Sequence, residues 1–329
     1  METDVKKRIS QKIDFGAFFS TYGITIALMM IIVVAAILEP TFLTKDNLMN
    51  VLRNIIVTGL SAFGMTFVFM MGMIDLSVGA IISLCGCVCV TLANRFVVTP
   101  EQDGNTILVI LATALVGAAV GAINGMLISL IKGRLGSALI ITYAMQMVIA
   151  AVALLYANGN FVNGEYYEGL YADLGRGYLP IIVFFVIAII LQFLLKNTKF
   201  GKNVSFVGAN RDCAQMSGVN VAKHVILVFM ISGICAALSG FYVTARIGSA
   251  NPTQGTGYEM NAIAAAVVGG TSMSGGHGSI FNTVIGVLVI SVLNNALGIM
   301  GVDSNSQLLI RGVIIILAVA LDMWNKKRA

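Results

Sequence analysis

The sequence predicts an all-α, polytopic membrane protein with about ten transmembrane helices, one of them short or broken. Only 11% of its 329 residues are charged, whereas soluble domains are about 25% charged. The mean hydropathy is +0.92. Residues 135–164 and 260–302 contain no Asp, Glu, Lys or Arg, and each stretch can hold at least one span of about 20 residues. Because so few charges cannot cover a water-exposed surface, a soluble fold is excluded.

Runs of apolar residues place the spans along the chain. We expect them near 18–38, 55–74, 78–93, 106–131, 136–156, 179–195, 225–245, 259–270, 279–300 and 306–324. The eighth stretch is too short to cross a bilayer alone and is expected to be a broken or re-entrant helix. Irregular backbone survives at membrane depth only beside protein or a water-filled cavity. We interpret residues 1–329 as a single transmembrane domain.

The basic residues predict the orientation, because Lys and Arg concentrate in cytoplasmic loops. With the N-terminus inside and ten spans, 14 of the 20 Lys and Arg residues fall inside, and both termini are cytoplasmic. The six outside are Lys45, Arg53, Arg95, Arg176, Arg246 and Arg311. The net charge of +5 is therefore a sign of membrane topology, and nothing else in the sequence supports nucleic-acid binding.

Enzyme chemistry has little support in the sequence. No G-x-x-x-x-G-K-[ST] motif is present, so the chain lacks the loop that holds ATP phosphates. Neither His224 nor His277 lies in a pattern that would activate a nucleophile. The five cysteines form no C-x-x-C pair, so we expect no metal site and no bound cofactor. The scarcity of charges within the spans also weakens an ion-driven carrier, although a sodium site built from carbonyl groups remains an alternative.

The first motif with chemical content is Met73-Ile-Asp-Leu-Ser-Val-Gly79, between two apolar stretches. An Asp at the bilayer centre costs about 2.5–3.5 kcal/mol on insertion scales. Asp75 is therefore expected to cap a helix, to face a cavity or to reach an interface. Asp75 and Ser77 can each accept hydrogen bonds from free amides at a helix start. A structural cap is the simpler interpretation, and a role in passage or gating is the alternative.

The second motif is the segment 196–224, which is polar, contains glycine and is longer than usual connections. It ends in Asp212-Cys-Ala-x-x-x-Gly218. We expect it to lie inside the cell, to contain a short central helix and to dock onto a soluble partner. A solvated connector would explain its charges equally well.

The third motif, residues 251–278, places a small-residue apolar helix between two glycine-rich breaks. Interrupted helices commonly line substrate paths in transporters, and small residues also let helices pack closely. Both interpretations stay open for Glu259 and Asn261. Gly117, Gly121 and Gly125 recur every fourth residue and predict a packing face.

These three segments, together with the tail NNALGIMGVDSNSQLLIRGVIIILAVALD, resemble the permease subunits of bacterial ABC importers for ribose, galactose and xylose. The specific matches are IDLSVG, NTKFGKN, VGANRD, SGVNV and GYEMNAIAAAVVGGTSMSGGHGS. The resemblance implies a type II importer-like permease in the bacterial plasma (inner) membrane, which translocates a simple sugar by alternating access. It also implies a second permease copy, a cytoplasmic ATPase that uses ATP and Mg, and an external sugar-binding protein.

The same resemblance assigns residue roles. The contact with the ATPase would include Asn210, Arg211, Asp212, Ala214 and Gly218, since this stretch is similar to the coupling loop of such permeases. Asp75, Ser77, Glu259 and Asn261 are candidates for the translocation path or its gate. The chain departs from the family pattern at Met73, where glycine is usual, and at Asn261, where aspartate is usual. The second departure puts in doubt any role that requires a charge at position 261.

The loop 157–178 is the candidate contact for the binding protein, through Tyr166, Tyr167 and Tyr171. An aromatic belt at the membrane interface is the alternative. The sequence leaves two alternatives for the function as a whole. The first is an importer of a nucleoside, an amino acid or a signalling molecule, which would share these features. The second is an ATP-independent carrier or channel, which would share some of them.

Overall fold

The computed structural model describes residues 15–97, 100–165, 169–303, 305–310, 312–314 and 316. The elements, in order, are α2 (Phe15–Leu38), η1 (Pro40–Leu43), α3 (Lys45–Met70), α4 (Val78–Phe96), η2 (Pro100–Asn105), α5 (Thr106–Leu130), α6 (Leu135–Tyr156), β1 (Val162–Asn163), α7 (Gly169–Gly175), α8 (Leu179–Asn197), α9 (Lys199–Ala209), α10 (Arg211–Met216), α11 (Val221–Ile247), β2 (Ser249–Ala250), α12 (Tyr258–Val268) and α13 (Ile280–Ile299). The all-α prediction is confirmed, because β1 and β2 are only two-residue strands that pair antiparallel.

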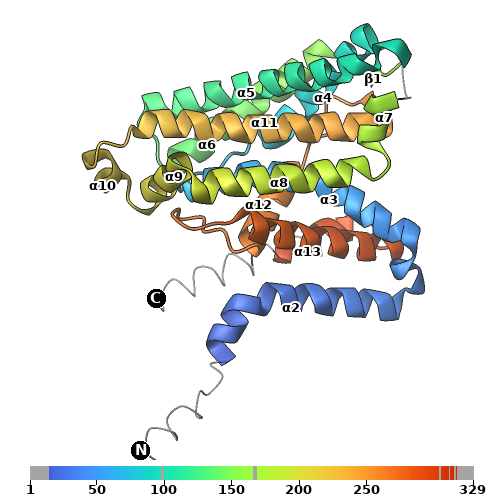
Figure 1. Cartoon of the computed structure of the whole chain (residues 1–329), viewed down its shortest axis with the longest axis horizontal. Helices are drawn as coiled ribbons and strands as arrows, with labels where there is room; N and C mark the ends of the chain where they lie inside the picture. Colours follow the sequence, from blue (N-terminus) through green and yellow to red (C-terminus); the bar gives the residue numbers. More distant parts are fainter. Residues whose placement is uncertain are drawn as a thin grey trace, which may run out of the picture.

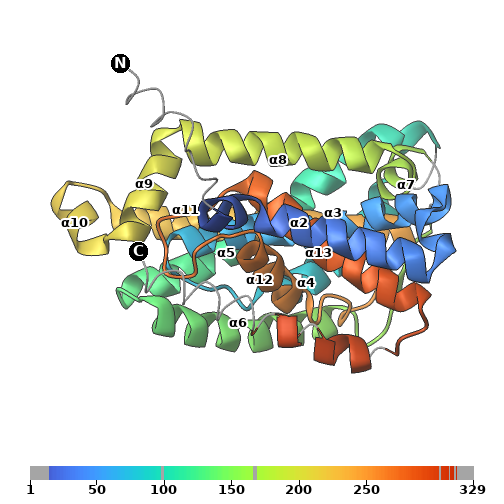
Figure 2. The same ribbon diagram turned by 90° about the horizontal axis from the view of Figure 1, so that it is seen from below.

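The long helices run roughly parallel to the longest axis of the molecule (Figure 1). Helix α10 projects beyond the bundle at one end, which we call the α10 end. The other end, which we call the β-ribbon end, carries α7 and the β1–β2 pair (Figures 1 and 2). Seven described helices are long and apolar enough to cross a membrane: α3, α4, α5, α6, α8, α11 and α13. These helices make the chain a multi-pass membrane protein.

Two helices form the centre of the bundle. Within α3 and α11 most side chains are buried, whereas α5, α6 and α8 expose large apolar side chains such as Leu115, Leu155 and Ile189. This distribution is expected if α5, α6 and α8 face lipid, where apolar exposure carries no cost.

The glycine repeat of α5 packs against α11, as predicted. A Cβ atom on Gly117 would overlap the carbonyl oxygen of Gly233, and one on Gly121 would overlap that of Phe229. On Gly125 a Cβ would lie 2.6 Å from the Cα of Ile226. The two backbones therefore approach closely along three helical turns, which is a common way to join helices in a membrane.

Two of the sequence predictions need correction. The stretch expected at 55–74 is α3, which begins at Lys45 and ends at Met70, where Gly72 turns the chain at φ +68°. The start of α3 was not predicted, because residues 45–54 are mostly polar and continue the helix beyond the apolar run. The segment 196–224 is mostly helical, as α9 and α10, whereas we expected one short central helix. Of the tenth expected span, 306–324, residues 306–310, 312–314 and 316 are helical, and the rest lies outside the described residues.

The expectation for the eighth stretch is confirmed. Helix α12 has 11 residues, which is about half the length that a bilayer requires. It begins after Gly257, which has φ +90°, and it ends at the turn Gly269–Gly270, where Gly270 has φ +81°. Left-handed backbone of this kind favours glycine, so the two glycine-rich breaks set both ends of α12.

Candidate functional site

A cavity of about 920 Å³ lies beside α12, toward the β-ribbon end of the bundle. Its walls come from α3, α11, α12 and α13, and from residues 308 and 312. The side chains that can form hydrogen bonds in it are Asn54, Thr58, Arg246, Thr256, Tyr258, Asn261, Ser291, Asn294 and Asn295. Pockets for small ligands usually measure about 300–1,000 Å³. The cavity therefore has the size of a binding site, and the residues that line it include Thr256, Gly257 and Tyr258 at the start of α12.

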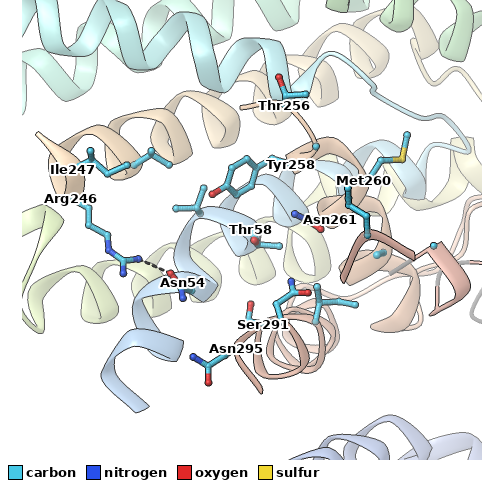
Figure 3. Close-up of a pocket in the computed structure, with 18 residues that line it drawn as sticks. Asn54, Thr58, Arg246, Ile247, Thr256, Tyr258, Met260, Asn261, Ser291 and Asn295 are labelled. Atoms are coloured by element: carbon cyan, nitrogen blue, oxygen red, sulfur yellow. Dashed lines mark hydrogen bonds between the residues drawn. The ribbon is translucent and has the colours of Figure 1, made fainter. Parts of the chain in front are cut away.

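The polar lining of the cavity is mostly uncharged. Arg246 is the one charged residue among the described residues that line it, and its Nη1 donates a 2.6 Å hydrogen bond to Oδ1 of Asn54. This pair joins the end of α11 to α3 at one side of the cavity, and Tyr258 and Asn261 of α12 also line it (Figure 3). Amides, hydroxyls and one guanidinium suit a neutral ligand that both donates and accepts hydrogen bonds.

Asn261 and Glu259, both predicted from the sequence, have different positions. Asn261 lines the cavity, as expected for a residue of the path. Glu259 is 6% exposed, and its carboxylate accepts from the backbone amide of Gly257 at 3.1 and 3.2 Å. A Cβ on Gly79 would overlap Oε2 of Glu259. Glu259 therefore caps α12 and packs against the start of α4, behind the cavity wall.

Asp75 and Ser77 are fully buried and do not line the cavity. Oδ1 of Asp75 accepts from the backbone amide of Ser77 at 3.0 Å and from its hydroxyl at 2.6 Å. Oδ2 accepts from the hydroxyl of Ser232 on α11 at 2.8 Å. The N-cap residue of α4 is Ser77, and its side chain makes no capping bond, because its hydroxyl donates to Asp75 and accepts from Nδ2 of Asn124 at 2.7 Å. Asp75 holds the amide of Ser77 in the turn before α4 and bonds no amide of the helix itself.

The predicted coupling residues gather at the α10 end. The side chain of Asn210 caps α10 by accepting from the amide of Cys213 at 2.9 Å. Ala214 is fully buried and faces the bundle, whereas Met216 is 81% exposed. Gly218, two residues after the end of α10, has φ +83°. Helix α10 is therefore anchored on one face and presents the other outward.

Two arginines attach this helix to the loop before α6. Arg211 donates to the carbonyl oxygen of Gly133, and Arg134 pairs with Asp212 at 3.1 Å. Both partners of the ion pair are largely exposed, so it contributes about 1 kcal/mol at most. Burial, with the neighbouring charge of Arg134, lowers the pKa of Arg211 from its ordinary value.

Of the three tyrosines predicted to contact a binding protein, the structure describes only Tyr171. Tyr166 and Tyr167 lie outside the described residues. Tyr171 is only 3% exposed, and its ring packs edge-on against Phe241 at 5.5 Å. The expectation for Tyr171 is therefore corrected, because α7 turns this side chain into the bundle and away from the outer surface.

Several cavity residues were not predicted from the sequence. Asn54, Arg246, Ser291, Asn294 and Asn295 come from three separate helices, so their spacing along the chain has no pattern. One signal was available in the sequence. Asn294 and Asn295 are adjacent within an apolar stretch without charges, and such polar side chains are costly in a membrane unless they face a partner or water. Within the described residues, no group of three or more His, Cys, Asp or Glu side chains could hold a metal ion.

Comparison with known proteins connects this geometry to transport. The family model described as branched-chain amino acid transport system / permease component matches residues 47–319. The ribose import permease protein RbsC of Bacillus subtilis is 38% identical over 98% of both chains. The D-allose transport system permease protein AlsC of Escherichia coli is 37% identical over 97% of both. The galactose/methyl galactoside import permease protein MglC of Salmonella typhimurium is 34% identical over 94% of this chain and 96% of its own.

No solved structure matches the chain. The family model covers most of the sequence, and the relatives align along nearly all of it. The chain therefore belongs to the family of permease components of ABC transport systems.

Proposed function

We propose that the chain is the membrane subunit of an ATP-driven importer for a simple sugar, a pentose or a hexose. The observation that carries this proposal is the cavity beside the half-helix α12, whose described polar lining holds amides, hydroxyls and one guanidinium, without a carboxylate. Such groups can pair with the hydroxyls of a sugar without attracting cations. The similarity to ribose, allose and galactose permeases supports the same class of cargo.

The missing ATP-binding loop and the exposed face of α10 indicate the partners. The sequence has no ATP-binding loop, so a separate cytoplasmic ATPase would hydrolyse ATP with Mg. Helix α10 and its flanking residues Asn210 and Gly218 would dock on that ATPase, at the end of the bundle opposite the β-ribbon end (Figure 1). A second copy of this chain and an external sugar-binding protein would complete the importer, with α10 on the cytoplasmic side of the plasma membrane.

Transport would proceed by alternating access. Closure of the ATPase on ATP would move α9 and α10, and the cavity would change the side of the membrane to which it opens. Asn261 would contact the sugar, whereas Asp75, Ser77 and Glu259 would hold the surrounding backbone in place. Binding energy in the permease can be small, because the external binding protein would select the sugar.

A second candidate cargo is an amino acid. The matching family is described by branched-chain amino acid transport, and Arg246 in the cavity could pair with a carboxylate. The proposal of a sugar rests on closer relatives, which align over nearly the full length of the chain.

Purified complexes test the proposal. The chain is co-expressed with the ATPase encoded beside it, isolated through a tag on the permease and placed in liposomes. Vanadate-sensitive ATP hydrolysis is then measured with the neighbouring binding protein and each candidate pentose, hexose or amino acid. Stimulation by one sugar supports the proposal. Stimulation only by an amino acid assigns the second cargo, and the absence of any associated ATPase contradicts an ABC importer.

A further inference from the structure

The segment between α3 and α4 begins near the α10 end of the bundle, where it packs against α9 and the loop after α12. The carbonyl oxygen of Met70 accepts a 3.0 Å hydrogen bond from the amide of Gly276, and a Cβ on Gly208 of α9 would overlap the same oxygen. A Cβ on Gly72 would lie 3.3 Å from the carbonyl oxygen of Ser274. The end of α3, helix α9 and the loop after α12 therefore meet backbone to backbone.

The middle of this connection is fixed by buried side chains. The carboxylate of Asp75 binds the hydroxyl of Ser232 on α11, and the amide of Leu76 donates to Oγ1 of Thr142 on α6 at 3.1 Å. Asn124 on α5 donates to the hydroxyl of Ser77. Three spans thus hold residues 73–76, which lie outside α3 and α4 and follow the bond from the amide of Met73 to the carbonyl oxygen of Val68 at the end of α3.

The far end of the connection touches the base of the cavity. Gly79 lies against the carboxylate of Glu259 and the carbonyl oxygen of Gly255, and the amide of Gly255 donates to Oγ of Ser83 at 2.8 Å. Helix α12 begins at this contact, and the next residues after Glu259, Met260 and Asn261, line the cavity. Residues 70–79 therefore form an unbroken set of contacts from α9 to α12.

We propose that residues 70–79 are the positioning segment that couples movement of α9 and α10 to movement of the short helix α12. The hydrogen bonds of Asp75 and the close contact at Gly79 hold the segment to its neighbours. The proposal rests on the function proposed above. Close packing makes such a segment move as a unit, because its glycine contacts leave no space for sliding. Loosening the segment should separate ATP hydrolysis from sugar movement and leave assembly intact.

The main test compares two buried serines of α11. Ser232→Ala removes the donor to Oδ2 of Asp75. Ser239→Ala is the matched control, because Ser239 is equally buried but donates to the backbone oxygens of Val57 and Cys235, away from the segment. The measured quantity is the number of ATP molecules hydrolysed per sugar imported in liposomes. A defect confined to folding or insertion lowers both rates together and leaves this ratio unchanged.

We expect Ser232→Ala to raise the ratio about fivefold or more, the size of typical coupling between sites. The ratio of Ser239→Ala should stay at the wild-type value. Gly79→Ala places a methyl group against Glu259 and should act in the same direction as Ser232→Ala. Its control is Gly136→Ala, since nothing lies within 4 Å of a Cβ at that position.

Equal ratios in wild type and Ser232→Ala, or equal changes in the two serine variants, would overturn the positioning role. If Gly79→Ala fails to insert, the serine pair decides. A failure of the proposed function is recognised separately. In that case wild-type complexes show no ATP hydrolysis stimulated by any sugar, and this is seen before any variant is compared.

Discussion

At the scale of single residues, Asp75 shows how a carboxylate is accommodated inside an apolar bundle. It is fully buried and accepts three hydrogen bonds from Ser77 and Ser232. A buried polar group that loses its partner costs about 1–3 kcal/mol. The position therefore needs an acceptor of this shape, whether or not a negative charge is present.

Replacing Asp75 tests this requirement. Asp75→Ala should lower the free energy of unfolding by about 1–3 kcal/mol, because the hydroxyls of Ser77 and Ser232 lose their acceptor. Asp75→Asn should lose less, since its oxygen can accept from Ser77 while its amide donates to the hydroxyl of Ser232. Thermal unfolding of the detergent-solubilised chain gives the comparison. Equal melting temperatures for wild type and both variants would show that the network contributes nothing to stability.

Asn261 is the residue that the proposed function places against the cargo. Asn261→Ala should slow sugar uptake about fivefold, because one hydrogen bond is worth about 1 kcal/mol. Met260→Ala is the control, since Met260 lines the same cavity without a strong hydrogen-bonding group. Uptake is measured in liposomes at equal amounts of assembled complex. If Met260→Ala reduces uptake as much as Asn261→Ala, the polar contact has no special role.

At the scale of elements, α10 is a helix of six residues that depends on its attachments. Ala214→Glu should abolish co-purification of the ATPase, because a carboxylate cannot be buried at this fully buried position and α10 must move. Gly136→Glu adds the same charge at an exposed position at the start of α6, the helix whose preceding loop α10 contacts. The control should keep the ATPase bound. Retention of the ATPase by Ala214→Glu would remove α10 from the docking surface.

The elements also show what the sequence could predict. The short α12 and the packing face at Gly117, Gly121 and Gly125 followed from local patterns, namely paired glycine breaks and a four-residue repeat. The cavity wall did not, because Asn54, Arg246 and Asn295 meet only after three separate helices pack. The start of α3 was missed for another reason: apolar content marks the part of a helix that lies at membrane depth and gives no sign of its polar extension.

At the scale of the whole molecule, the distribution of basic residues predicts that the α10 end is cytoplasmic. Cys213 on α10 is exposed, whereas Cys85, Cys87, Cys89 and Cys235, the other cysteines of the described bundle, are buried. The native protein therefore carries its own probe of orientation.

When the chain is expressed without its ATPase, so that α10 stays uncovered, a membrane-impermeant maleimide should modify the protein in inverted membrane vesicles and leave it unmodified in intact cells. Cys213→Ser should remove the labelling in the vesicles, since the remaining cysteines are buried. Labelling of intact cells that disappears in Cys213→Ser would reverse the orientation.

The proposed function requires that this permease moves a sugar at the expense of ATP hydrolysed by a partner. The most direct measurement is the accumulation of a radiolabelled sugar inside liposomes that contain the purified complex, with the sugar-loaded binding protein on the side of the β-ribbon end and ATP on the side of α10. We expect accumulation above the external concentration that stops with vanadate. Equilibration of the sugar without ATP, or accumulation that follows an ion gradient, would contradict the proposed function and assign the chain to a channel or a carrier.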